Sequence, residues 1–198
     1  AIDTSYSSST EYPFQIHFID VGQADASLIL CGEHTLLIDG GNVEDSSLIY
    51  SYLNKLGISY LDAVICTHAH EDHVGGLAGA LNKADAGAVY APVTSYDSEA
   101  FENFKSATEN QGLEISAPPV GDSIAIGDAV VEFLGPIREY SDTNNSSIVV
   151  RIIYEDTSFL FTGDAEYESE LDILESGCTL KSTVLKVAHH GSDSSTSY

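Results

Sequence analysis

The stretch Thr67-His68-Ala69-His70-Glu71-Asp72-His73 places three histidines and an aspartate within six positions. It follows the apolar run 61–66, which predicts a buried strand, and precedes Val74-Gly75-Gly76, which opens a small-residue helix expected over 74–81. Strand ends in α/β folds are where ligands commonly bind. Neutral imidazole is the commonest metal ligand, and a carboxylate adds negative charge. The stretch therefore predicts a metal site at the end of a strand.

The spacing of these residues favours two ions. We expect His68 and His70 to bind one ion, because residues two apart at a strand end point to the same side. Asp72 and His73 lie on the following turn and can face a second ion. Two neighbouring ions need a bridging carboxylate. Asp164, which ends a second apolar strand, is the expected bridge, with a plain acidic turn residue as the alternative.

A pair of histidines, His189-His190, follows the last apolar run, 182–187. We favour His189 as a metal ligand and expect His190 to contact substrate, donate a proton or orient a ligand. The reverse assignment is the alternative. Three more aspartates are expected behind the ligating imidazoles, with ordinary turn roles as their alternative: Asp20, Asp25 and Asp39.

The rest of the chain predicts an α/β domain in which one unit occurs twice. A hairpin over 26–38 is followed by Asp39, a helix over 46–56, a strand and His68. A hairpin over 147–161 is likewise followed by Asp164, a helix over 166–174, a strand and His189. Such a duplication would place both histidine-bearing strand ends along one edge of a sandwich; coincidence of common α/β patterns is the alternative. Further elements are expected as strands over 14–20 and 88–93, a helix over 98–110, and a pair of strands over 124–134 with a turn at Gly127-Asp128.

Composition limits the function. The chain has 198 residues, 43% of them hydrophobic, which suffices for a folded core and excludes a disordered acidic tail. Seven Lys and Arg against 31 Asp and Glu give a net charge of −24. Because nucleic-acid affinity comes mainly from basic side chains on phosphates, this charge disfavours a nucleic-acid partner, and it disfavours anionic membrane surfaces for the same reason. No apolar run approaches the 18 residues that predict a transmembrane helix.

The chain ends and the cysteines carry weaker signals. Residues 1–13 are rich in Ser and Thr and are expected to form a flexible arm or linker before a domain over 14–198. Such an arm often follows a removed leader, so we expect an extracellular or cell-surface location, with a cytoplasmic one as the alternative. The sequence stops soon after the histidine pair, so we expect the domain to continue beyond Tyr198. Three separated cysteines without a C-x-x-C pair predict no thiol metal site.

Several motifs together carry a family resemblance. His68 to His73 matches the H-x-H-x-D-H signature of metallo-β-lactamase-fold hydrolases. Four further stretches resemble the ComEC-type branch, which includes the soluble domain of DNA-uptake channel proteins and stand-alone relatives: Phe18 to Asp25, Leu37 to Gly41, Asp142 to Ser147 and His189 to Ser192.

The resemblance implies an αββα sandwich with a dinuclear centre of two divalent ions, Zn²⁺ first and Mn²⁺ as the alternative. It places Asn144, Asn145 and Ser192 near the substrate or behind the ligands. One departure concerns the first ion, because the wider family supplies a third histidine and this chain has none between His73 and His189. The ComEC-type branch shares this loss, so the first ion is expected to bind two histidines, the bridge and water.

These residues predict metal-assisted hydrolysis, with Asp72 and His190 as the expected catalytic groups. Asp72 would be both ligand and orienter of the attacking water. We favour a phosphodiester substrate, and a small one over a nuclease substrate because of the charge. The alternatives are a carbonyl hydrolase, such as a lactamase, lactonase or thioesterase, and a metal-binding interaction module without turnover.

Overall fold

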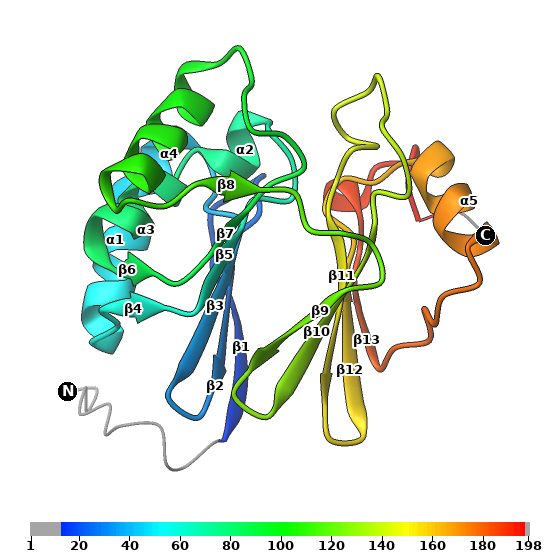
Figure 1. Ribbon diagram of the computed structural model, residues 1–198, viewed down its shortest axis with the longest axis horizontal. Helices are drawn as coiled ribbons and strands as arrows, with labels where there is room; N and C mark the ends of the chain where they lie inside the picture. The colour runs from blue at the N-terminus through cyan, green and yellow to red at the C-terminus, as the bar shows by residue number, and fades with distance from the viewer. Residues whose placement is uncertain (1–12, 197–198) are drawn as a thin grey trace.

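The computed structural model describes residues 13–196 and arranges them in four layers, helices, sheet, sheet and helix (Figure 1). The first sheet has the order β1(Phe14–Phe18), β2(Ser27–Cys31), β3(His34–Ile38), β5(Ala63–Ile65), β7(Val89–Tyr90), β8(Ile115–Ser116). The second has the order β13(Val184–Lys186), β12(Thr157–Phe161), β11(Val149–Tyr154), β10(Ala129–Gly135), β9(Ser123–Ile126). The predicted αββα sandwich is confirmed. The expected arm falls almost wholly outside the described residues.

The helices divide between the two outer faces. One face carries α1(Ser46–Leu56), α2(Glu71–Val74), α3(Leu77–Lys83) and α4(Glu99–Asn110), and the other carries α5(Tyr167–Glu175) (Figure 1). A short separate pair, β4(Tyr60–Leu61) with β6(Asp85–Ala86), lies beside the first sheet. Single 3-10 turns occur at η1(Val43–Asp45) and η2(His189–Gly191). None of the helices within residues 13–196 has the length and apolar content that a membrane span requires.

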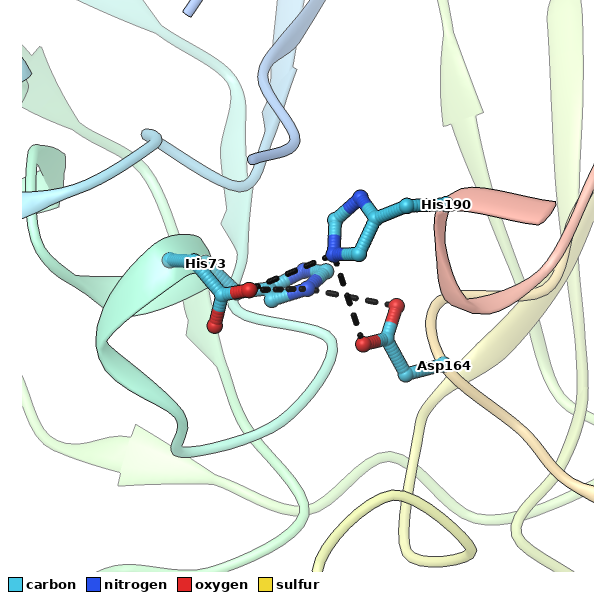
Figure 2. A group of neighbouring side chains, drawn as sticks. His73, Asp164 and His190 are labelled. Carbon is cyan, nitrogen blue, oxygen red and sulfur yellow. Dashed lines mark hydrogen bonds and ion pairs between the residues drawn. The ribbon is translucent and has the colours of Figure 1, made fainter. Parts of the chain in front are cut away.

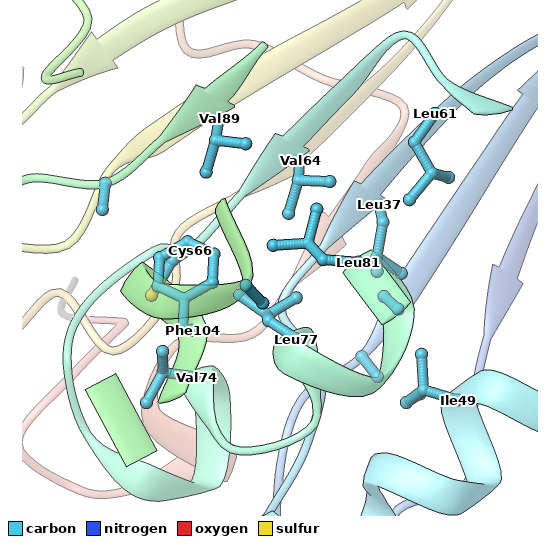
Figure 3. Close-up of a cluster of buried hydrophobic side chains, with 14 of the residues drawn as sticks. Leu37, Ile49, Leu61, Val64, Cys66, Val74, Leu77, Leu81, Val89 and Phe104 are labelled. Carbon is cyan, nitrogen blue, oxygen red and sulfur yellow. The ribbon is translucent and has the colours of Figure 1, made fainter. Parts of the chain in front are cut away.

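Both faces of the first sheet are buried, because its central strands alternate apolar residues toward two different cores. Leu37 and Val64 face the helices with Leu77 and Phe104 (Figure 3). Their strand neighbours Ile38 and Ile65 face the second sheet. Alternation with a period of two residues produces this division. The continuous apolar runs in the sequence are therefore strands covered on both sides, and they fix the two sheets and the outer helices relative to one another.

The predicted duplication is confirmed by the topology. In the first half β1, β2 and β3 pair antiparallel, and β5 then pairs parallel to β3. In the second half β10, β11 and β12 repeat the antiparallel order, and β13 pairs parallel to β12. The helix between the last two strands of each unit is α1 in one half and α5 in the other. Because a parallel pair ends at one edge of its sheet, each half brings an aspartate and a histidine-bearing loop to the same edge.

Three predicted elements differ from the structure. The helix expected over 74–81 is two helices, α2 and α3, separated at Gly75 and Gly76. A Cβ on Gly76 would lie 1.9 Å from the carbonyl oxygen of Gly40, so the chain there is pressed against the β3–α1 loop. The strand expected over 61–66 is interrupted at Asp62, whose carboxylate accepts from the backbone of Thr35. The strand expected over 88–93 keeps regular pairing only in β7.

Candidate metal centre

The histidine-rich loop begins where β5 ends. Cys66 is buried in the core, and Thr67 and His68 leave the sheet at its edge. His70 then caps α2 in extended backbone conformation, so Asp72 and His73 lie in that helix's first turn. The amide of Gly40 donates to the carbonyl of His73 over 2.7 Å. A strand, a histidine-rich loop and a short helix therefore follow one another in the sequence. This order brings the four candidate ligands, His68, His70, Asp72 and His73, back over the end of β3.

Asp39 holds the ring of His73. Its carboxylate accepts hydrogen bonds from the amide and the hydroxyl of Thr67, both over 2.7 Å, and from Nδ1 of His73 over 2.9 Å. All three residues are buried. Behind metal-bound histidines, a carboxylate on Nδ1 holds the ring and directs Nε2 at the ion, and Asp39 makes that contact here. Asp39 thus lies behind a candidate ligand, the place that the sequence suggests for it.

Three side chains converge on the ring of His73: those of Asp72, Asp164 and His190. The ligand atoms of all four residues lie within 4.8 Å of one another. Figure 2 shows His73, Asp164 and His190 directed toward one another. Nε2 of His190 is 3.2 Å from Oδ2 of Asp72 and 3.6 Å from Oδ2 of Asp164. Nε2 of His73 is 3.2 Å from Oδ1 of Asp164, without hydrogen-bond geometry, so both of these buried atoms lack a hydrogen-bond partner. Buried polar atoms without partners are costly, and a cation between them removes that cost.

His68 and His70 lie next to this group. Nε2 of His68 and Nδ1 of His70 are 3.1 Å apart. Two nitrogens bound to one tetrahedral zinc at about 2.0–2.1 Å each lie about 3.3 Å apart, so this separation suits a shared ion. Oδ2 of Asp164 is 3.9 Å from Nε2 of His68. The two oxygens of Asp164 therefore face different histidines, as a bridging carboxylate would.

Burial and charge set the protonation of the group. Burial, followed by the neighbouring His73, holds the pKa of His68 well below its ordinary value, which keeps that ring neutral. For His73 burial also disfavours the cation, but Asp39 and Asp164 outweigh it and raise the pKa to about 10. Burial of Asp164 opposes its ionisation, yet the contact with His73 holds the pKa of that carboxyl well below its ordinary value. Without metal, the ring of His73 is thus an imidazolium held between the carboxylates of Asp39 and Asp164, and a metal ion bound there would displace its proton.

The two consecutive histidines are oriented differently. Both have left-handed backbone conformation, with φ of 48° at His189 and 52° at His190. Nδ1 of His189 lies 3.1 Å from Oε1 of Glu166, and its Nε2 lies 3.9 Å from Oδ2 of Asp164. His190, for which we expect a substrate or proton-transfer role, belongs to the four-residue group of Figure 2. Which of the two binds metal stays a prediction.

The remaining candidates fall into three environments. Asp25 is buried beside the centre, 3.7 Å from Nδ1 of His190, and forms an ion pair with Lys186. Asp20 is exposed and accepts from the amide of Gly22, which is a turn contact. The other three lie around the start of α5: Asn145 accepts from the amides of Glu166 and Ser169, Asn144 donates to Glu166, and the hydroxyls of Ser192 and Ser194 are 2.9 Å apart.

Sequence reasoning missed Glu166 and Lys186. Glu166 is one of several acids at the start of an acidic helix, so nothing in its local pattern separates it from a solvent-exposed residue. Lys186 had a signal, since it lies between Leu185 and Val187 in an apolar strand. A lysine is seldom buried without a partner, so a charged residue within such a run indicates an internal ion pair.

Comparison with known proteins identifies the family. The sequence model of the metallo-beta-lactamase superfamily matches residues 19–197. The chain belongs to the metallo-beta-lactamase superfamily. It is 31% identical over 202 residues to ComE operon protein 3 of Bacillus subtilis, covering 92% of this chain and 26% of that protein. It is 29% identical to competence protein ComA of Neisseria gonorrhoeae, covering 90% and 24%. The resemblance to the ComEC-type branch is confirmed.

Solved structures of the superfamily agree on the fold. The metallo-beta-lactamase SMB-1 superposes with a TM-score of 0.60 at 16% identity, covering 88% of this chain and 76% of that one. The superposition establishes the shared fold, and an identity of 16% leaves the substrate open. The chain spans about a quarter of the length of the two competence proteins, so their activities as whole proteins are not transferred to it.

Proposed function

We propose that this metallo-beta-lactamase superfamily domain hydrolyses phosphodiesters with two divalent ions. The observation that carries the proposal is the convergence of Asp72, His73, Asp164 and His190, with His68 and His70 beside them. Imidazoles and carboxylates in this ratio suit Zn²⁺, with Mn²⁺ as the alternative. Bound there, the ions would supply an activated water and hold a substrate oxygen.

The donor set fits two ions better than one. Four buried or half-buried carboxylates, Asp25, Asp39, Asp72 and Asp164, face the centre, and Lys186 contributes one ammonium, which leaves three negative charges. One divalent ion would leave this count at −1, and two would bring it to +1, which the hydroxide formed from an activated water would offset. His68 and His70 would hold the first ion and Asp72 and His73 the second, with Asp164 between them. His189 or His190 would complete the second ion.

A phosphodiester is the favoured substrate because a centre with two ions suits displacement at phosphorus. Two-metal centres hold both the attacking and the leaving oxygen during displacement at phosphorus. One relative is named a competence protein, and the ComEC-type branch that this sequence resembles includes the soluble domain of DNA-uptake channel proteins; DNA is a phosphodiester polymer. With a net charge of −24, the domain favours a short diester or chain end over the interior of a long polyanion.

The test measures metal content and hydrolysis of bis(p-nitrophenyl) phosphate by protein loaded with Zn²⁺ or Mn²⁺. We expect two ions per chain and turnover that falls to background in His68→Ala and Asp164→Ala. His34→Ala is the matched control, because His34 is exposed and pairs with Asp62 at the opposite end of β3. Two bound ions with no turnover of any ester would show a binding module. Nitrocefin hydrolysed faster than the diester would show a carbonyl hydrolase.

An extracellular or cell-surface location belongs to the same proposal. It rests on the Ser- and Thr-rich start of the chain, which lies outside the described residues.

A further inference from the structure

Among the helices that the structure describes, α5 alone lies on the outer face of the second sheet (Figure 1). It turns Ser169 and Ile173, which are four residues apart, toward the sheet, and both are buried. Ile173 packs in a small core with Leu134 and Val149 of the strands beneath it. A helix that packs through one narrow row leaves the rest of its surface to solvent.

A second row of α5 is apolar and faces solvent. Tyr167, Leu171 and Leu174 are 61%, 39% and 60% exposed. Their spacing of four and then three residues places them in one line along a helix. With 3.6 residues per turn, this line lies nearly opposite Ser169 and Ile173. Single exposed apolar side chains are common on protein surfaces, whereas an aligned group indicates a contact surface. We call these three residues the outer row of α5.

Acidic residues border the outer row on both sides. A spacing of four and three is that of the a and d positions of a coiled coil, and the e and g positions beside them are Glu168, Glu170 and Glu175. The stretch 166–175 contains five carboxylates and no Lys or Arg. In coiled coils the charges at e and g select the partner helix. The outer row is therefore suited to a helix that carries Lys or Arg beside its own apolar row.

Arg138 shows how a basic side chain binds at this border. Its guanidinium, from the β10–β11 loop, forms ion pairs with Glu168 and Asp172 and lies 4.2 Å from the centroid of the Tyr140 ring. Together with this guanidinium, the carboxylates of 166–175 still carry a net charge of −4. A second copy of this chain would bring the same glutamates against one another, so charge disfavours a dimer through this row.

We propose that the outer row of α5 docks an amphipathic helix of another polypeptide. Apolar side chains of that helix pack against Tyr167, Leu171 and Leu174, and its Lys or Arg side chains face the neighbouring glutamates. Because α5 is short, the contact depends on few anchors, and the loss of one anchor removes much of the affinity. The inference concerns a surface and is independent of the metal centre and of the proposed hydrolysis.

The test measures binding of a fluorescein-labelled three-heptad peptide by fluorescence anisotropy at about 0.15 M salt. The peptide has Leu at its a and d positions, Lys at e and g, and Ala and Gln elsewhere. A second peptide of the same composition has its Lys at b and c, so that its net charge and apolar row are unchanged. We expect the first peptide to bind about 10-fold more tightly, because its Lys side chains face the glutamates beside the outer row.

Two variants of matched charge locate the contact. Leu174→Asp should weaken binding of the first peptide by about 10-fold, because it replaces an apolar anchor by a carboxylate. Leu48→Asp is the control, since Leu48 is 40% exposed on α1, on the other outer face of the sandwich, and the change in net charge is the same. It should bind the peptide as the unaltered protein does. If circular dichroism shows that Leu174→Asp is not folded, Tyr167→Asp replaces it.

Equal affinity for the two peptides would overturn the proposal, as would equal losses in Leu174→Asp and Leu48→Asp, because binding would then follow the overall negative charge. A dimer in sedimentation that Leu174→Asp abolishes would also overturn it and show that a second copy covers the outer row. None of these measurements uses metal or substrate. Their outcome therefore stands whether or not the domain hydrolyses phosphodiesters.

Discussion

Individual carboxylates in this domain act by holding histidine rings. Asp39 binds Nδ1 of His73 and two groups of Thr67, Glu166 lies against Nδ1 of His189, and Asp25 lies near Nδ1 of His190. In each case the contact is on Nδ1, which leaves Nε2 toward Asp164. Three imidazole rings therefore have a carboxylate on the same side, behind Nδ1, and the centre's geometry depends on residues that do not themselves face the metal position.

Replacing Asp39 by Asn tests this arrangement. The amide keeps one acceptor but turns a donor toward Nδ1 of His73 or the hydroxyl of Thr67, so the ring loses its support. We expect Zn²⁺ affinity to fall about 10- to 100-fold in calorimetry. Asp62→Asn is the matched control, since Asp62 makes the same two kinds of contact, to Nδ1 of His34 and the amide of Thr35, away from the centre. Equal losses in both variants would refute the role of Asp39.

The raised pKa of His73 predicts a pH dependence of the metal-free protein. Its folded pKa of about 10 exceeds the ordinary value of 6.5, so the folded state binds the proton more tightly. The resulting stability is complete below about pH 6.5 and is lost as pH rises through about 10, with a slope of at most about 1.4 kcal/mol per pH unit. Urea unfolding of metal-free protein from pH 7 to 10 should show this decline. It should be absent in His73→Gln, and a decline of equal slope in that variant would assign it to other groups.

The sequence alone cannot decide which of His189 and His190 binds the metal, and the cause of this ambiguity is structural. Adjacent residues in a strand alternate sides, but here both residues take φ near +50° after β13 has ended. The ring directions then depend on that turn and on contacts with Glu166 and Asp25, which come from distant parts of the chain. By contrast, the six-position signature places its own ligands through local geometry, so the sequence alone suffices to group His68, His70, Asp72 and His73.

At the scale of elements, Asn145 supplies the N-terminal cap of α5 from another segment. Its side-chain oxygen accepts from the amides of Glu166, the residue immediately before α5, and of Ser169, which lies in the first turn of α5. The neighbouring Ser147 accepts from the amide of Asp164. The stretch that resembles the ComEC-type motif thus fixes the loop carrying Asp164 and Glu166. The sequence of this stretch indicates a role at the candidate metal centre, but only the fold shows that Asn145 acts there by capping α5.

Asn145→Ala should therefore affect both stability and the centre. Removing a cap costs about 0.5–2 kcal/mol, and we expect a loss in that range by urea unfolding together with weaker Zn²⁺ binding. Ser98→Ala removes the cap of α4, where the hydroxyl accepts from the amide of Phe101, away from the centre. It should lower stability by a similar amount and leave Zn²⁺ affinity unchanged. If Asn145→Ala also left Zn²⁺ affinity unchanged, the cap would have no part in positioning Asp164.

Regular elements are predictable where an apolar pattern runs without interruption, and less so where tertiary packing interrupts them. The helix α1 has its predicted bounds, because its apolar spacing and the left-handed Gly57 mark both face and end. The break between α2 and α3 depends on the contact of Gly76 with Gly40, which no local pattern encodes. The short β8 likewise forms only because its residues reach the edge of the first sheet beside β7.

At the scale of the whole molecule, charge should govern access to the centre. The net charge is −24, and three of the seven basic residues are already paired with acids: Arg138, Arg151 and Lys186. Two divalent ions would offset only four charges. A long nucleic-acid strand approaching the domain would then be repelled over the Debye length, which is about 30 Å at 0.01 M salt and about 8 Å at 0.15 M.

This repulsion predicts an unusual salt dependence. Cleavage of a long single-stranded DNA should become faster as salt rises from 0.01 to 0.15 M, by roughly 10-fold in kcat/KM, because screening removes the barrier to encounter. Hydrolysis of bis(p-nitrophenyl) phosphate, which carries one charge, should change little over the same range. Both substrates are assayed with the same metal-loaded preparation, and the rate of Asp164→Ala is subtracted as the background. DNA cleavage that slows with salt would show that a basic surface grips the strand, since releasing counterions from phosphates gives the opposite slope. The domain would then be a nuclease whose DNA-binding surface has a positive electrostatic potential although its net charge is negative.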